Sequence, residues 1–201
     1  MGFFKRFGKK EEKFVTVVSG LPRSGTSMMM KMLEAGGIAP LTDKIRRADD
    51  DNPKGYFEFE RVKKMPDGDT AWVEDAQGKA VKVIAALLEY LPQEYTYKVL
   101  FMRRSMDEIL ASQKQMLIRS EKPTDEISDE KLAELYSKHL VKVESWVSQQ
   151  PNILVFDVDY NDLMQNPEPY PTKIQRFLGV EMDADKMSVV VDPALYRQRK
   201  A

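Results

Sequence analysis

The sequence predicts one α/β domain of three layers, with a mostly parallel sheet of about four to five strands and helices on both faces. Short apolar segments recur along the chain, and each is followed by residues with helical periodicity. No hairpin turn joins two of these segments, which favours crossover connections and parallel pairing. The segments expected to form strands are 14–18, 80–84, 97–102 and 152–158.

The first unit runs from the strand at Phe14–Val18 through a tight loop at Gly20–Gly25 to a helix that starts at Thr26. Gly36 and the glycine after it should end that helix, because glycine adopts the left-handed conformation found after helix ends. A chain of 201 residues suffices for one core. We therefore divide the sequence into a basic tail and a single domain, residues 1–13 and 14–201.

The middle of the chain predicts two more strands, each followed by a helix. Ala80–Ile84 is expected to form a strand and Ala85–Leu91 a short helix that Pro92 ends. Tyr97–Met102 is apolar at nearly every position, as in a central strand of a parallel sheet. Ser105 follows at the start of the next helix, where its hydroxyl is expected to act as the N-cap.

The last third predicts a long helix, a strand and a late helix. Ser128–Gln150 has the spacing of an amphipathic helix, with Leu135 on its apolar face. Asn152–Val158 is expected to be the fourth strand. A further helix over Pro167–Leu178 should end at Gly179.

Composition excludes several kinds of site. Cysteine is absent, so disulfides, thiol nucleophiles and cysteine-ligated zinc are excluded. His139 is the single histidine, which excludes a multi-histidine metal site, and its position among lysines favours an ordinary surface or half-buried residue. The formal net charge of −1 favours neither nucleic acid nor a membrane as partner.

No targeting signal is expected in the N-terminal segment. No run approaches the roughly 20 apolar residues that span a membrane, and no signal peptide precedes the first strand. A cytoplasmic location is therefore expected. Met1–Lys13 contains five Lys or Arg and three Phe. It is expected to be a solvated terminus, with weak contact to an anionic membrane surface as the alternative. The oligomeric state is left open.

The loop Gly20–Gly25 predicts an anion-binding site. It lies between a strand end and a helix N-terminus, where backbone N–H groups and the positive end of the helix dipole bind phosphates. The spacing is G-x-x-x-x-G, but Thr26 and Ser27 follow where a P-loop has Lys and then Ser or Thr. The cation comes instead from Arg23, within the loop. We expect this loop to bind phosphate or sulfate.

The segment LPRSGTS, residues 21–27, resembles the loop that holds the 5′-phosphosulfate of 3′-phosphoadenosine 5′-phosphosulfate (PAPS) in sulfotransferases. A second segment agrees with it in the expected order. Arg104, after a predicted strand, precedes Ser112 by eight residues, similar to the Arg and Ser with which sulfotransferases hold the 3′-phosphate of PAPS. The run Asp159–Gly179 also resembles the family's structural Tyr-x-Asp-Leu…Phe-Leu-Gly segment.

The resemblance implies a fold like that of P-loop nucleotide hydrolases and transfer of a sulfuryl group from PAPS to a hydroxyl or amine without a metal. The product nucleotide would be 3′,5′-adenosine bisphosphate. By resemblance, the 5′-phosphate and the sulfuryl oxygens would be bound by Arg23, Ser24, Gly25, Thr26 and Ser27.

The resemblance also implies roles outside the loop. Lys82, in the second predicted strand, would neutralise charge that develops on the bridging oxygen. Arg104 and Ser112 would hold the 3′-phosphate. The family's Gly-rich loop for that phosphate is not visible near the C-terminus. The basic end, residues 195–201, either folds over the 3′-phosphate or is a solvated tail.

The expected general base differs from that of small-molecule sulfotransferases. Those enzymes carry Lys-Thr-His on the second strand and use the histidine as the base. Aligning Lys82 with that lysine puts Ile84 at the histidine position. A carboxylate is therefore expected, as in carbohydrate- and tyrosine-modifying members. The aromatic segment 56–60 forms either a short edge strand or a helix start, and supplies the first two candidates. In order of preference, the candidates are Glu58, Glu60 and Asp43.

Two other functions stay open on the sequence. The G-x-x-x-x-G spacing also fits a P-loop nucleotide kinase or ATPase, although the loop lysine is missing. Ile84 also fits a non-catalytic nucleotide-binding relative that lacks a base. The sequence does not identify the acceptor, for which we expect a small molecule or a carbohydrate and no nucleic acid.

Overall fold

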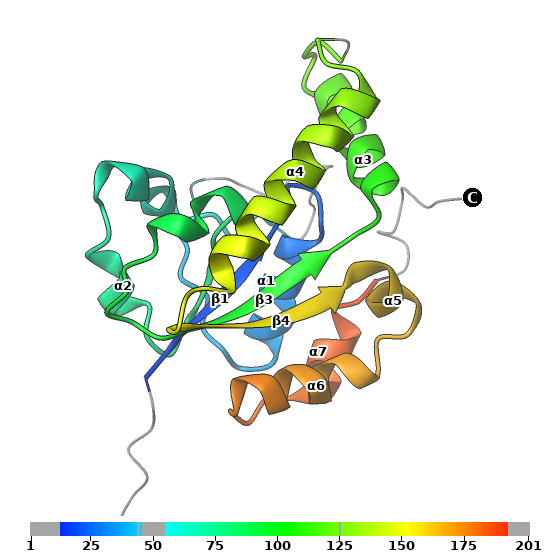
Figure 1. The fold of residues 1–201 in the computed structure, drawn as a ribbon. Helices are drawn as coiled ribbons and strands as arrows, with labels where there is room; N and C mark the ends of the chain where they lie inside the picture. The colour runs from blue at the N-terminus through cyan, green and yellow to red at the C-terminus, as the bar shows by residue number, and fades with distance from the viewer. Residues whose placement is uncertain (1–12, 44, 46–54, 125, 193–201) are drawn as a thin grey trace, which may run out of the picture.

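The computed structural model describes residues 13–43, 45, 55–124 and 126–192, which form one four-stranded sheet with helices on both faces (Figure 1). The strands lie in the order β2-β1-β3-β4, and every neighbouring pair is parallel. The predicted α/β fold class is confirmed. The strands are β1 (Val15–Gly20), β2 (Ala80–Lys82), β3 (Tyr97–Arg103) and β4 (Ile153–Asp159).

β1 and β3 form the centre of the sheet. Every residue of β1 is buried, as expected for a strand that has neighbours on both sides and helices on both faces. Successive side chains of β3 enter opposite faces, so that Val99 joins one apolar cluster and Leu100 the other. Gly20 pairs with Met102, so the two strands end side by side. The loop after β1 and the helix after β3 therefore begin at the same edge.

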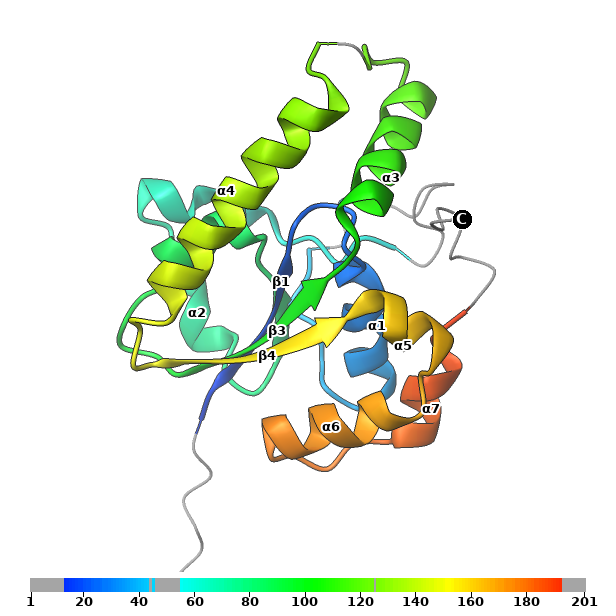
Figure 2. The same cartoon turned by 45° about the vertical axis from the view of Figure 1, so that its right-hand side comes forward.

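The helices divide between the two faces, as Figure 2 shows. One face packs against α1 (Thr26–Ala35), α5 (Tyr160–Gln165), α6 (Pro169–Leu178) and α7 (Ala184–Val189). The other face packs against η1 (Glu60–Asp67), α2 (Trp72–Asp75), η2 (Ala85–Tyr90) and α4 (Asp129–Val147), of which η1 and η2 are 3-10 helices.

α3 (Met106–Arg119) leaves the end of β3 and forms with α4 an antiparallel pair that projects beyond the sheet (Figure 2). Ser128 caps α4 by accepting a hydrogen bond from Lys131 N at 3.3 Å. Leu135, expected on the apolar face of this helix, is 44% exposed. That expectation is wrong because α4 joins the core only over residues 140–147, nearer its C-terminal end.

Two local predictions also differ from the structure. The Ser105 hydroxyl makes no capping bond to α3, and its backbone N–H instead donates to Asn161 Oδ1 at 3.0 Å. The second strand ends at Lys82, two residues before the expected end at Ile84. Of the two alternatives for residues 56–60, the structure shows the helix start, because residues 56–59 form no strand and lead into η1, which begins at Glu60.

The predictions for the two basic ends fall on residues 1–12 and 193–201, outside the described part of the chain. Among the helices that the structure describes, none combines the length and apolar character needed to span a membrane.

Candidate functional site

The loop between β1 and α1 closes around a buried serine. Ser24 is fully buried, and its Oγ donates to Leu21 O at 2.7 Å. Gly20 has a φ of 145°, and a Cβ at that position would lie 2.6 Å from Ser24 Oγ. Arg23, which is half-buried, adopts a left-handed φ of 68°. Glycine at position 20 is therefore required for the loop to close.

Gly25 brings the start of α1 against an aromatic ring. Its φ is 96°, and a Cβ there would lie 2.3 Å from a ring carbon of Tyr160. The first backbone N–H groups of a helix have no partner within the helix, and the dipole places partial positive charge there. Thr26 and Ser27, both half-buried, form the first turn of α1. This turn offers hydrogen-bond donors and positive potential to an anion.

The two sequence motifs meet beside this loop. Arg23 Nε donates to Ser112 Oγ at 3.0 Å. Arg104 Nη1 donates to Arg23 O at 2.9 Å. The contact exists because β1 and β3 are neighbours that end at one edge, which brings the loop after β1 against α3. Both predicted arginines therefore lie at the same edge of the sheet.

Arg104 is half of a buried ion pair. Its Nε lies 3.0 Å from Glu108 Oε2, and the two side chains are 7% and 3% exposed. The guanidinium carbon lies 4.6 Å from the centre of the Tyr160 ring. A buried charge needs such a partner, because desolvation is otherwise very costly. Arg104 thus holds the backbone of Arg23, and Glu108 reduces the positive charge that Arg104 offers to a ligand.

Lys82, the last residue of β2, lies beside the first turn of α1. Its Nζ donates to Tyr56 O and lies 5.9 Å from the centre of the Tyr56 ring. Ser27 Oγ donates to the same carbonyl oxygen at 3.3 Å. The side chains of Lys82 and Ser27, two residues predicted to belong to the PAPS site, therefore share one hydrogen-bond acceptor on the protein.

Glu58 lies two residues after this carbonyl, with its side chain 17% exposed. Its Oε2 lies 3.2 Å from Lys63 Nζ. The hydrogen bond from Lys63 to Glu60, and secondarily the one to Glu58, raise the pKa of Lys63. Thr42 Oγ1 and Asp43 N hold the backbone by donating to Glu58 O at 2.7 and 3.3 Å.

The other two carboxylate candidates are engaged differently. Glu60 is 42% exposed and pairs with Lys63 at 2.7 Å. Asp43 accepts backbone N–H bonds from Ile45 at 3.0 Å and from Glu60 at 2.6 Å. Asp43 therefore fixes the segment that carries Glu58. Of the three candidates, Glu58 lies nearest in sequence to the carbonyl that Lys82 contacts.

Sequence reasoning missed three groups at this site. Glu108 follows Arg104 by four residues, a spacing typical of helical ion pairs that could have indicated it. Tyr160 directly follows β4, and its position after a strand next to β3 was a weaker signal. The carbonyl of Tyr56 had no signal, because every residue carries that group.

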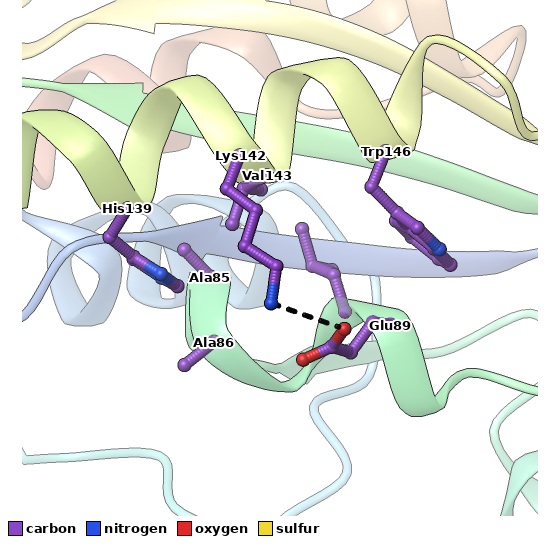
Figure 3. Close-up of a pocket in the computed structure, with 8 residues that line it drawn as sticks. Ala85, Ala86, Glu89, His139, Lys142, Val143 and Trp146 are labelled. Carbon is purple, nitrogen blue, oxygen red and sulfur yellow. Dashed lines mark ion pairs between the residues drawn. The ribbon is translucent and has the colours of Figure 1, made fainter.

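A small pocket lies apart from these residues, between η2 and α4 (Figure 3). His139, Lys142 and Trp146 point from α4 toward two alanines and Glu89 of η2, and Lys142 Nζ lies 4.0 Å from Glu89 Oε2. None of the predicted site residues lines this pocket. Across the described ranges, no group of three or more His, Asp or Glu side chains is arranged to hold a metal ion.

Comparison with known proteins identifies related sequences and folds. The sequence model of the sulfotransferase family matches residues 54–184, more than half of the chain. The match includes Glu58, Lys82, Arg104 and Ser112 and begins after the Gly20–Gly25 loop. A search of curated proteins gives no match.

Several solved sulfotransferase structures resemble the fold. STF1 from Mycobacterium tuberculosis H37Rv has a TM-score of 0.57 and 15% identity, with 92% of this chain and 73% of that one covered. Mouse SULT7A1 complexed with PAP has a TM-score of 0.54 and 20% identity, covering 90% and 63%. The sulfotransferase domain of the Synechococcus PCC 7002 olefin synthase has a TM-score of 0.53 and 15% identity, covering 98% and 93%. At these identities the likeness establishes the fold alone.

Proposed function

Because the chain belongs to the sulfotransferase family, we propose that it transfers a sulfuryl group from PAPS to a hydroxyl or amine of a small molecule or carbohydrate. The mouse structure with a similar fold is a complex with PAP, which agrees with a donor of this type. The acceptor class follows from the sequence resemblance.

The contact between Arg23 and Ser112 carries the proposal. Arg23 belongs to the loop that resembles the 5′-phosphosulfate site, and Ser112 belongs to the motif that resembles the 3′-phosphate site. One nucleotide can engage both motifs only if they lie close together. The 3.0 Å distance between Arg23 Nε and Ser112 Oγ meets this condition.

The loop binds the 5′ end of the donor through backbone N–H groups of residues 24–27 and through Arg23. Each hydrogen bond to a charged group contributes about 1.5–3 kcal/mol. Ser112 and Arg104 bind the 3′-phosphate, with Arg104 also holding the backbone of Arg23 through their 2.9 Å hydrogen bond. Binding and orientation are the main contributions that the protein makes to such a transfer.

Lys82 and Glu58 act on the reacting atoms. A bond forms between sulfur and the acceptor oxygen or nitrogen, and the bond between sulfur and the bridging oxygen breaks. Lys82 stabilises the negative charge that the bridging oxygen acquires. Glu58 accepts the proton that the acceptor loses. The position of Glu58 two residues from the carbonyl bound by Lys82 supports this assignment. The reaction proceeds without a metal ion, and EDTA should leave the rate unchanged.

Thermal unfolding with nucleotides tests the proposal. Millimolar 3′,5′-adenosine bisphosphate should raise the melting temperature in the absence of magnesium, because a ligand that binds only the folded state stabilises it. A P-loop kinase or ATPase would instead respond to ATP with Mg²⁺. Stabilisation by ATP and Mg²⁺ alone, or by neither nucleotide, would contradict the proposal. A non-catalytic relative would bind the nucleotide yet transfer no sulfate to any acceptor.

A further inference from the structure

One main-chain carbonyl connects the proposed donor site with the segment of the proposed base. Tyr56 O accepts hydrogen bonds from Lys82 Nζ and from Ser27 Oγ. Lys82 is assigned above to the bridging oxygen of PAPS, and the backbone N–H of Ser27 to its 5′ end. Glu58 lies two residues farther along the same segment. An oxygen of the protein thus contacts the side chains of two residues that belong to the proposed PAPS site.

The direction of this carbonyl depends on a residue in a disfavoured conformation. The plane of the peptide between Tyr56 and Phe57 is set by ψ of the first residue and φ of the second. Phe57 has a φ of 51°, which is uncommon for a bulky residue. Contacts on both sides of Phe57 hold residues 56–58 in place. Tyr56 is 5% exposed, and Thr42 Oγ1 donates to Glu58 O at 2.7 Å.

We infer that Phe57 is a positioning residue, whose left-handed backbone turns the Tyr56 carbonyl toward Lys82 and Ser27 until an anionic oxygen of the donor displaces it. This inference rests on the proposed function. A hydrogen bond between an ammonium and an anionic oxygen is roughly twice as strong as one between neutral groups. The phosphosulfate therefore competes effectively with a carbonyl for Lys82.

Displacement has a consequence for the base. When the carbonyl turns away, φ of Phe57 leaves the left-handed region and the disfavoured conformation is relieved. The turn occurs directly before Glu58, whose own carbonyl stays held by Thr42 and by the backbone N–H of Asp43. Donor binding is thereby transmitted to the Glu58 segment before an acceptor is deprotonated.

Two isomeric substitutions test the role of Phe57. Phe57→Ile and Phe57→Leu both introduce an apolar side chain, and the two side chains are isomers. Only isoleucine is branched at Cβ. Branching penalises the left-handed conformation more strongly. Phe57→Ile should therefore weaken the hydrogen bonds that Tyr56 O accepts from Lys82 and Ser27 more than Phe57→Leu does. The Phe57→Ile variant should then bind 3′,5′-adenosine bisphosphate about fivefold more tightly than the Phe57→Leu variant. Isothermal titration gives both affinities, and urea unfolding without nucleotide gives both stabilities.

A purely structural role predicts a different result. Both variants would then lose stability through altered packing, while their nucleotide affinities would be equal. Equal affinities, or weaker binding by Phe57→Ile, would overturn the inference.

Amide hydrogen exchange of the unmodified protein provides the second measurement. Adding 3′,5′-adenosine bisphosphate should slow exchange in peptides covering residues 20–27 and accelerate it over residues 55–60. Slower exchange at 20–27 with unchanged or slower exchange at 55–60 would reject the inference and keep the proposed function. If the nucleotide affects neither segment and leaves the melting temperature unchanged, the proposed function fails and the inference fails with it.

Discussion

Arg23 Nε donates to Ser112 Oγ at 3.0 Å, although 89 positions separate the two residues in the sequence. The contact joins the loop after β1 to the helix after β3 at one edge of the sheet. Arg104 strengthens the connection by donating to Arg23 O at 2.9 Å. The guanidinium and the backbone carbonyl of Arg23 are therefore both held by residues from a different unit of the fold.

Replacing Arg23 should weaken nucleotide binding. Arg23→Ala removes a charge-assisted contact worth about 1.5–3 kcal/mol, which corresponds to a loss of about tenfold to a hundredfold in affinity for 3′,5′-adenosine bisphosphate. Arg176→Ala, at an exposed position on α6, is the matched control and should leave the affinity unchanged. Isothermal titration of both variants measures the difference. Equal affinities would remove Arg23 from the binding site.

Replacing Glu58 should impair turnover and spare binding. Glu58→Gln keeps the size of the side chain but removes its basicity, so kcat for sulfate transfer should fall about 10²–10⁴-fold. The affinity for 3′,5′-adenosine bisphosphate should stay within about twofold of the original value, since the base acts on the acceptor. Glu60→Gln provides the control, because Glu60 contacts the same Lys63 at 2.7 Å. A larger loss of kcat with Glu60→Gln than with Glu58→Gln would make Glu60 the general base in place of Glu58.

Gly25 should be less tolerant of a side chain than another left-handed glycine. Gly68 has a φ of 89°, and no heavy atom of the described residues lies within 4 Å of a Cβ built there. Gly68→Ala should cost about 1–2 kcal/mol of unfolding free energy through backbone strain alone. Gly25→Ala should cost roughly 1–3 kcal/mol more, because its Cβ would lie 2.3 Å from the Tyr160 ring. Urea unfolding compares the two, and equal losses would rule out close packing at Gly25.

Stability should fall in strongly alkaline solution. Burial raises the pKa of Tyr97, while burial and the hydrogen bond to Asp162 raise that of Tyr170. Folding therefore favours the neutral phenols. Their contribution is complete below the unfolded pKa of about 10 and is lost as the pH rises from there through the folded values.

Urea unfolding between pH 8 and pH 11 measures this dependence. Tyr170→Phe should reduce the fall in unfolding free energy above about pH 10, because a phenol with a raised pKa can then no longer titrate. Tyr90→Phe is a suitable control, since Tyr90 is 40% exposed. An identical pH dependence in the Tyr170 variant and the unmodified protein would contradict the assignment.

The local elements followed from the sequence because their causes are local. The apolar run before Gly20 forms β1, and α1 starts at Thr26 as expected. Gly179 ends α6 with a φ of 71°, the left-handed conformation expected after a helix. Leu135 shows the limit of this reasoning, because its spacing suits an apolar helix face but it lies outside residues 140–147, the part of α4 that packs on the core.

The features of the candidate site also divide into those that a local sequence pattern predicts and those that depend on packing. The sequence by itself determined the G-x-x-x-x-G loop after the first strand, the Arg104 and Ser112 spacing and a lysine within the second strand, because each is a pattern of neighbouring residues. Only the tertiary structure decided that Arg23 Nε donates to Ser112 Oγ and that Tyr56 O engages Lys82. Those contacts depend on which strands lie side by side and on how one peptide is turned. Such relations arise from packing between distant segments and leave no pattern along the chain.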